Sequence, residues 1–300
     1  VVDVEEKTVL RMKLNYEVHD RSPNMPDFFN PASFNVNSDP GLNEILDNLE
    51  KAATDERIKG IYLDLSMIQA GMGTMLEIRD ALIEFKESGK WIVAYSESMS
   101  QGSYYLASVA DKVYLNPHGV IEFRGLGAEM FFLKGMLEKL DIDVQVIKVG
   151  KYKSAIEPFI LDKMSEANRE QMETLLNSVW ESMLIDIGES RGLSIEALNK
   201  LADELGAFDS EVAKSSGLID DLLYYDEVKA DLRGRLELEE DDDIEFLSFN
   251  KYLNAKHDKS SKKFSRERIA VIYALGGIES GKGDDLTIGS DRIADAIRTA

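Results

Sequence analysis

Helical and strand patterns alternate along this chain from Leu42 onward, and this alternation restricts the possible folds more than any other feature. Apolar residues at helical spacing in residues 42–49 are followed by the short apolar run 60–65 (GIYLDL), and the pattern repeats in residues 75–85 and 91–95 (WIVAY). Fully apolar runs of this length are typical of parallel strands that helices cover on both faces. The sequence therefore predicts an α/β fold with crossover connections.

A long helix is expected behind Gly150. Ser165 is a preferred N-cap residue, and Gly192 stands where a helix that began there would end. The other expected elements are helices near residues 104–109 and 131–140, strands at residues 113–115, 120–123 and 144–149, and small helices that start at Ser194 and Asp209, the second closed by Gly217.

The composition changes near residue 250, where a polar and basic stretch reaches residue 268 and is typical of a linker. Behind it, the apolar run 269–275 (IAVIYAL) predicts a strand, and residues 291–300 echo the helical pattern of residues 43–52. This order indicates an internal duplication. We expect a first domain over residues 1–249, a linker over residues 250–267 and the truncated beginning of a second repeat over residues 268–300.

Charge and residue content exclude several kinds of partner. The net charge of -21 repels phosphate backbones, so nucleic acid is not an expected partner. The absence of cysteine rules out disulfides and thiol nucleophiles, and the three histidines are widely spaced. The acidic residues show no metal-binding spacing, so neither a metal nor a cofactor is expected. No apolar run approaches the roughly 18 residues of a membrane helix.

Two familiar patterns are better explained by local structure. Residues 188–192 (GESRG) match the nucleophile elbow G-x-S-x-G, but they fall at the expected end of a helix rather than between a strand and a helix. Residues 276–283 (GGIESGKG) resemble a phosphate-binding loop, but Gly283 stands where the magnesium-binding hydroxyl is required. We interpret both as loop and capping glycines.

The segment 150–159 (GKYKSAIEPF) places Lys153 among apolar residues directly after an expected strand. A lysine that acts as a general base must be neutral, and an apolar environment favours its neutral form. Composition alone also fits an ordinary surface lysine. With no cysteine and no well-placed histidine, lysine is nevertheless the remaining credible base for activating a hydroxyl group.

Residues 60–192 resemble the signal peptide peptidase A family, in its long form with two tandem repeats of the Clp protease/crotonase fold. Three segments carry the resemblance: residues 100–108 (SQGSYYLAS), residues 113–119 (VYLNPHG) and above all residues 149–159 (VGKYKSAIEPF), with Met164 and Ser165 behind the last. The resemblance implies a Clp/crotonase-like α/β fold with a helical extension. It also implies that Lys153 is the general base of a Ser-Lys dyad.

The resemblance further implies that this chain lacks the nucleophile. In the long form, the lysine of the first repeat serves a serine of the second, and Gln101 occupies the corresponding position here. An amide cannot attack a peptide carbonyl. The counterpart of the glycine pair that supplies oxyanion-hole amides is the segment 69–73 (QAGMG), which departs from the family pattern. Both missing parts are expected beyond Ala300.

We therefore expect a serine endopeptidase that degrades cleaved signal peptides and unfolded segments, with this chain inactive alone. By resemblance, the enzyme is a homotetramer on the periplasmic side of the bacterial inner membrane, held by an N-terminal anchor outside this chain. One alternative is a crotonase-type acyl-CoA hydratase or isomerase, which acyl-CoA binding would favour. Another is an inert interaction module, which Gln101 supports for this repeat alone.

Overall fold

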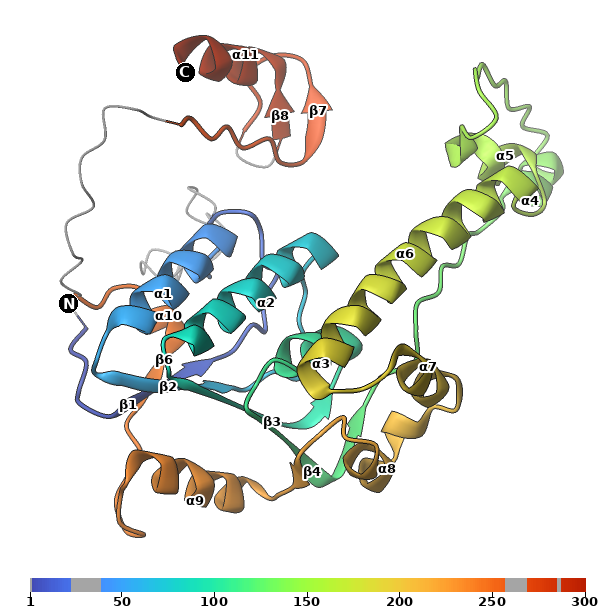
Figure 1. The fold of residues 1–300 in the computed structure, drawn as a ribbon. Coiled ribbons are helices and arrows are strands. Elements are labelled where there is room, and N and C mark those ends of the chain that lie inside the picture. The colour runs from blue at the N-terminus through green and yellow to red at the C-terminus, as the bar shows by residue number, and fades with distance from the viewer. Residues whose placement is uncertain (1, 23–38, 257–268, 285–286) are drawn as a thin grey trace. The chain divides into compact units, whose positions relative to one another are not determined.

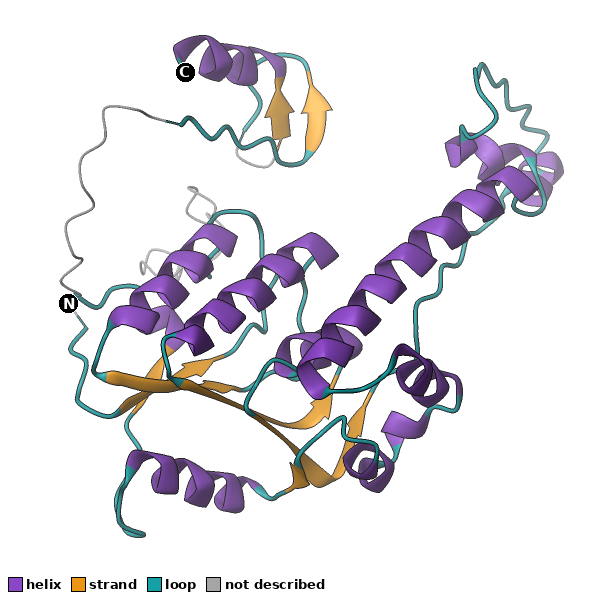
Figure 2. Cartoon of the chain, in the orientation of Figure 1, coloured by secondary structure: helices purple, strands orange, loops and turns teal. Residues whose placement is uncertain are grey.

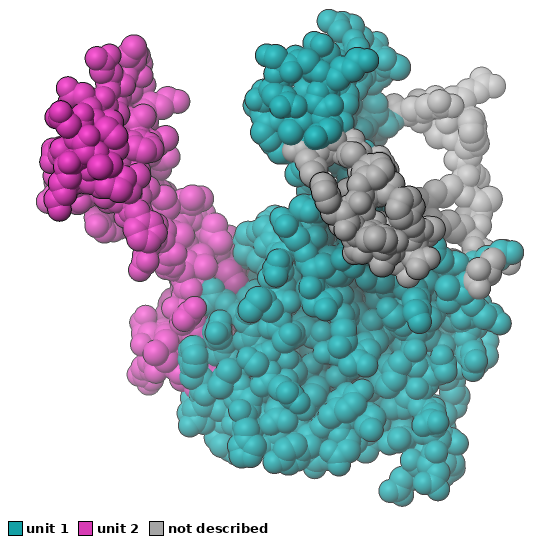
Figure 3. Space-filling model, turned by 180° about the vertical axis from the view of Figure 1, so that it is seen from behind, with its two compact units in different colours: residues 1–122, 208–300 teal, residues 123–207 magenta. Residues whose placement is uncertain are grey.

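The computed structural model describes residues 2–22, 39–256, 269–284 and 287–300 (Figure 1). The chain forms two compact units, which are coloured separately in Figure 3. Unit 1 comprises Val1–Glu122 and Phe208–Ala300, and unit 2 comprises Phe123–Ala207. The predicted linker 250–267 falls largely on residues outside the described ranges.

Unit 1 is built on a six-stranded sheet in which every neighbouring pair of strands is parallel, in the order β5-β4-β3-β2-β1-β6 (Figure 2). This confirms the predicted α/β fold with a parallel sheet. The strands are β1 (Thr8–Met12), β2 (Ile58–Leu63), β3 (Trp91–Met99), β4 (Lys112–Ile121), β5 (Asp221–Leu222) and β6 (Phe246–Ser248).

Helices cover both faces of this sheet, with α1 and α2 on one face and α9 on the other (Figure 1). Val9, Tyr62 and Val93 pack in one buried cluster with Val228 and Leu232 of α9. Residues at the alternate strand positions are also buried, which explains why these strands are apolar throughout. The helices of the unit up to residue 256 are α1 (Leu42–Thr54), α2 (Met72–Glu87), α3 (Gln101–Ala107), α8 (Ser210–Ser215), α9 (Tyr225–Leu236) and α10 (Phe249–Tyr252).

The two short strands expected at residues 113–115 and 120–123 form one strand, β4. Its pairing with β3 is irregular between Ser96 and Ser98, and Gly119 lies opposite this irregularity. A Cβ atom at Gly119 would lie 2.6 Å from the carbonyl oxygen of Glu97. The glycine therefore allows the two backbones to approach closely at the point where the sequence indicated a break.

Unit 2 contains the long helix α6 (Glu166–Arg191), with both ends as the sequence predicted. The hydroxyl of Ser165 accepts a hydrogen bond from the Asn168 amide, and Gly192 ends the helix with φ +68°. Ser190 lies in the last turn, so residues 188–192 form a helix end and not a nucleophile elbow. The remaining elements are α4 (Lys134–Lys139), η2 (Ser154–Ile156), α5 (Glu157–Ile160), α7 (Ile195–Asp203) and, at the boundary of the two units, η3 (Gly206–Phe208).

The strand expected at residues 144–149 is absent, and this prediction was wrong. The segment has no regular secondary structure, and most of its apolar side chains are exposed: Ile147 is 101% and Val149 88% accessible. The apolar pattern meets only the local requirement for a strand. A strand also needs a neighbour for its N–H and C=O groups, and no described strand lies beside this segment.

The C-terminal segment of unit 1 consists of β7 (Gly277–Glu279), β8 (Thr287–Gly289), which pairs parallel to β7, and α11 (Ser290–Thr299). The helix predicted at residues 291–300 is confirmed, whereas the strand predicted at residues 269–275 is wrong. Ile269 is 94% exposed there, again because no described strand pairs with the run. A second strand, rather than a helix, follows the glycine-rich loop after β7, unlike a phosphate-binding loop. None of the described helices has the length and apolar composition needed to cross a membrane.

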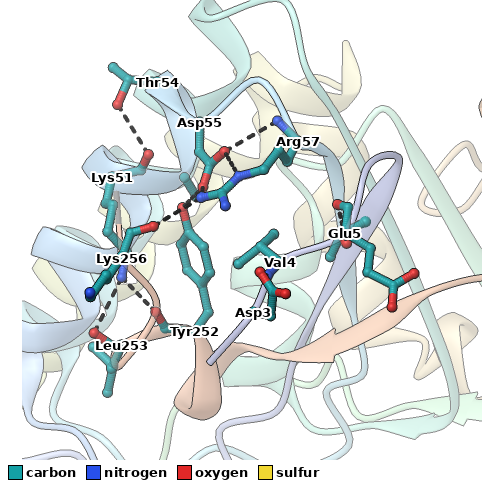
Figure 4. A network of polar contacts seen from close by, with 12 residues as sticks. Asp3, Val4, Glu5, Lys51, Thr54, Asp55, Arg57, Tyr252, Leu253 and Lys256 are labelled. Atoms are coloured by element: carbon teal, nitrogen blue, oxygen red, sulfur yellow. Dashed lines mark hydrogen bonds and ion pairs between the residues drawn. The ribbon is translucent and has the colours of Figure 1, made fainter. Parts of the chain in front are cut away.

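Helix α10 packs against residues near the end of α1, and Tyr252 of α10 contacts Asp55 (Figure 4). Phe249 and Tyr252 are fully buried, and the Tyr252 hydroxyl donates to the Asp55 carboxylate at 2.9 Å. Arg57 donates to both carboxylate oxygens of Asp55 at 2.8 and 2.7 Å. The first residues of the predicted linker are therefore packed against the sheet domain. The division into domains 1–249 and 268–300 stays a prediction.

This buried network predicts a loss of stability in acid. Burial alone would raise the pKa of Asp55, but hydrogen bonds from Arg57 and Tyr252 outweigh it and lower the pKa to about 2. A lowered folded-state pKa stabilises the fold above the unfolded pKa, near 4, and that stabilisation is lost as the pH falls toward 2. We expect Asp55→Asn to lower the free energy of unfolding at neutral pH by about 2 kcal/mol, and to lose less stability in acid than the parent.

Urea unfolding at several pH values measures both effects. Asp47→Asn is a suitable control, because Asp47 lies on the same helix, α1, and is exposed. Equal acid sensitivity of the parent protein and Asp55→Asn would contradict the assignment.

Candidate active site

Lys153 lies on a short irregular segment of unit 2 and is exposed. It directly precedes the single turn η2, and α5 follows without interruption. Gly150, three residues before it, has φ +107°, a backbone conformation that favours glycine. The chain therefore turns sharply just ahead of the lysine and presents its side chain to solvent.

A buried carboxylate lies four residues beyond the lysine. Glu157 is 2% exposed and accepts three hydrogen bonds: from the Ser165 amide at 3.1 Å, from the Ser165 hydroxyl at 2.6 Å and from the Asn168 side-chain amide at 3.0 Å. Burial alone would raise the pKa of Glu157, but the hydrogen bonds from Ser165 and Asn168 outweigh it and hold the pKa below its ordinary value. Glu157 is therefore ionised at neutral pH.

Two further hydrogen bonds fix the position of residues 150–159, which we call the lysine segment. The Tyr152 hydroxyl donates to the Glu170 carboxylate of α6 at 3.2 Å, and the Leu133 amide donates to the Pro158 carbonyl oxygen at 2.6 Å. The residues on both sides of Lys153 are thus attached to the first turns of α6, while Lys153 itself remains accessible.

The apolar pocket expected around Lys153 is not formed by the residues that the structure describes. Tyr152 is 49% and Phe159 42% exposed, and Ala155 is exposed as well. The sequence pattern indicated apolar neighbours correctly, but neighbours along a turn do not enclose a side chain. Desolvation of this amine would require surface from outside this unit.

In unit 1, the segments predicted to correspond to the nucleophile and to the oxyanion glycines lie together. Gln101 is the first residue of α3, directly after β3, and the segment 69–73 leads from the neighbouring strand β2 into α2. The Ser100 amide donates to the Ser66 carbonyl oxygen at 2.9 Å. A Cβ atom at Gly102 would lie 3.1 Å from Ile68. These segments share the carboxyl edge of the parallel sheet, where ligands bind in open α/β folds.

The alternative serines are poor candidates for a nucleophile. Ser103 is fully buried, and its hydroxyl lies 3.0 Å from that of Ser100. Ser154 begins η2 and is half-buried next to Lys153. Gln101 and the segment 69–73 belong to unit 1, whereas Lys153 belongs to unit 2.

The family of this chain follows from a match to a known protein family. Residues 84–239, more than half of the chain, match the sequence pattern of peptidase family S49. The chain belongs to peptidase family S49. The match includes Gln101, Lys153 and Glu157, and the parallel α/β architecture is consistent with the Clp/crotonase-like fold of S49 peptidases.

Relatives of this S49 chain are named as proteases. It is 32% identical over 294 residues to "Serine protease SPPA, chloroplastic" from Arabidopsis thaliana, covering 98% of the chain and 42% of that protein. It is 31% identical to "Protease 4" from Haemophilus influenzae, covering 84% of the chain and 42% of that protein, and 33% identical to "Protease 4" from Salmonella typhi, covering 86% and 43%. The chain thus spans less than half the length of these relatives.

Glu157 was missed by sequence reasoning in this S49 chain, although it lies within the lysine segment. A carboxylate placed among apolar residues and directly before a proline was a usable signal, because such a residue must be either exposed or fully hydrogen-bonded.

The described residues contain no cluster of three or more His, Cys, Asp or Glu side chains able to hold a metal ion.

Proposed function

We propose that this chain is the lysine-bearing part of a serine endopeptidase in which Lys153 is the general base. One observation carries the proposal: the S49 match includes a lysine that is exposed, while the residues on both sides of it are fixed to a long helix. A general base has to be held in place and has to reach its substrate. The protease names of the relatives support the same reaction class.

The proposed chemistry needs no metal or cofactor. The neutral amine of Lys153 takes the proton of a serine hydroxyl as that oxygen forms a bond to the scissile carbonyl carbon. The ammonium group then gives the proton to the leaving amine as the C–N bond breaks, and an acyl-enzyme remains. Water, deprotonated by the same amine, attacks the ester, and the ammonium group returns the proton to the serine oxygen as the acid product leaves.

We place the nucleophile outside this chain. Gln101 cannot supply it, and the segment 69–73 (QAGMG) departs from the family pattern of the glycine pair that supplies oxyanion-hole amides. The relatives are more than twice as long as the matched region, which leaves room for a second repeat.

Substrates, assembly and location are extensions of this proposal that rest on the family resemblance. The substrates are cleaved signal peptides and other unfolded segments, and the enzyme is a homotetramer anchored at the periplasmic side of the bacterial inner membrane. The exposed apolar residues of unit 2, among them Phe131, Ile147 and Val149, support assembly, because a monomer rarely leaves so many large apolar side chains in water.

Peptide hydrolysis by the full-length protein tests the reaction class. We expect cleavage of an unfolded peptide, loss of that cleavage after treatment with a fluorophosphonate, and no loss after treatment with a metal chelator. Mass spectrometry should place the adduct on a serine beyond Ala300. Binding of acyl-CoA without peptide cleavage would instead favour the crotonase alternative, and the absence of both would favour an interaction module, which Gln101 supports for this chain alone.

A further inference from the structure

Glu157 is the buried carboxylate of the lysine segment, and the proposed reaction gives it no role. Moving an ionised carboxylate out of water is strongly unfavourable unless it is well hydrogen-bonded. Here two oxygens receive three donors: the Ser165 hydroxyl reaches Oε1, while the Ser165 amide and the Asn168 side chain reach Oε2. Asn168 is itself 2% exposed, so the site is enclosed.

All three donors belong to the beginning of α6. Ser165 is its N-cap and Asn168 lies in its first turn. The N-terminus of a helix favours a negative charge, and the 26 residues of α6 make a rigid support. The carboxylate therefore joins the lysine segment to the most regular element of unit 2.

The connection from Glu157 back to Lys153 is short and itself hydrogen-bonded. Only the turn η2 separates the two residues, and the Glu157 amide donates to the Ser154 carbonyl oxygen within it. On the other side of the lysine, the Tyr152 hydroxyl reaches Glu170 on the same helix. A displacement of Glu157 would be transmitted to the backbone of Lys153.

We propose that Glu157 is a positioning residue that holds Lys153 in its catalytic place by fixing the lysine segment to the first turn of α6. The proposal rests on the proposed function of Lys153. Glu157 touches neither substrate nor reacting atoms. A general base displaced by about 1 Å loses on the order of a hundredfold in rate, while substrate contacts made elsewhere are unaffected.

Kinetics of the full-length protein test this role. Glu157→Ala should lower kcat for peptide hydrolysis about a hundredfold with KM unchanged. Glu157→Gln should stay within about tenfold of the parent, because its amide oxygen can accept two of the three hydrogen bonds and its amide nitrogen can donate to the Ser165 hydroxyl. Glu181→Ala, which removes an exposed carboxylate from α6, is the matched control and should leave kcat unchanged.

Hydrogen exchange of the 300-residue chain gives a second readout that needs no activity. In Glu157→Ala, amides of residues 150–160 should exchange at least about tenfold faster, while those in the middle of α6 keep their protection. If Glu157→Ala does not fold, Asn168→Ala takes its place, because it removes one donor of three and should lower kcat about tenfold.

An unchanged kcat in a folded Glu157→Ala protein, or an equal loss in Glu157→Ala and Glu157→Gln with unchanged exchange, would overturn the positioning role. If instead Lys153 is not the general base, Lys153→Ala would retain activity, and this result does not depend on the outcome of the Glu157 variants.

Discussion

Replacing Lys153 by alanine in the full-length protein should reduce peptide hydrolysis by about 10²–10⁴-fold, because that is the usual contribution of a general base to the rate. Folding should be unaffected, since the side chain is exposed. The measurement is kcat/KM for an unfolded peptide together with the thermal unfolding midpoint. Lys151→Ala is the control, because Lys151 is also exposed and lies two residues away.

Lys153→Arg separates the base from the positive charge. An arginine side chain keeps the charge and much of the reach but cannot lose its proton in a protein. It should therefore be as inactive as alanine. An arginine variant with near-normal activity would show that a cation, and not a base, is needed at this position, and would contradict the dyad.

The isolated 300-residue chain should form no covalent adduct with a fluorophosphonate, whereas the full-length protein should be labelled stoichiometrically. The reason is chemical: the family resemblance assigns Gln101 to the position of the nucleophile, and Ser103 is fully buried. Intact-mass spectrometry of both proteins after identical treatment measures the difference.

Gln101→Ser in the isolated chain should not create reactivity. A serine there would also need a base and two free backbone amides that converge within about 3 Å of the attacked carbonyl. The family resemblance assigns the oxyanion glycines to the segment 69–73, which departs from the family pattern, and Lys153 is proposed to serve a serine outside this chain. A stoichiometric adduct on the unmodified chain would overturn the divided site and direct attention to Ser154.

The sheet and the long helix could be predicted from sequence because their signals are local and redundant. Ser165 and Gly192 act as caps whatever surrounds them, and a parallel sheet covered on both faces leaves continuous apolar runs such as residues 60–65. The segments 144–149 and 269–275 show the same runs, but a run becomes a strand only beside another strand. That condition lies outside any local pattern.

The candidate site could likewise be predicted only in part. The residues around Lys153 resemble a segment of the signal peptide peptidase A family, and this resemblance pointed to Lys153 as the general base. The S49 match supports the family resemblance. The exposure of Lys153 agrees with the composition of its segment, which also fitted an ordinary surface lysine. The three donors to Glu157 could not be predicted, because they depend on where the first turn of α6 packs. Polar contacts between segments that are not adjacent in sequence leave no periodic signature.

The position of β1 in the sheet has a consequence for how the domain folds. This strand pairs with β2 on one side and on the other with β6, where Val9 lies opposite Phe246, near the far end of the domain. Contacts between residues so distant in sequence close a very long loop and form slowly. During synthesis, one edge of β1 stays open until the ribosome has released β6, and an open strand edge can pair with another chain. A chain interrupted shortly before Phe246 would therefore expose this edge permanently, and we expect it to aggregate rather than remain a smaller soluble domain.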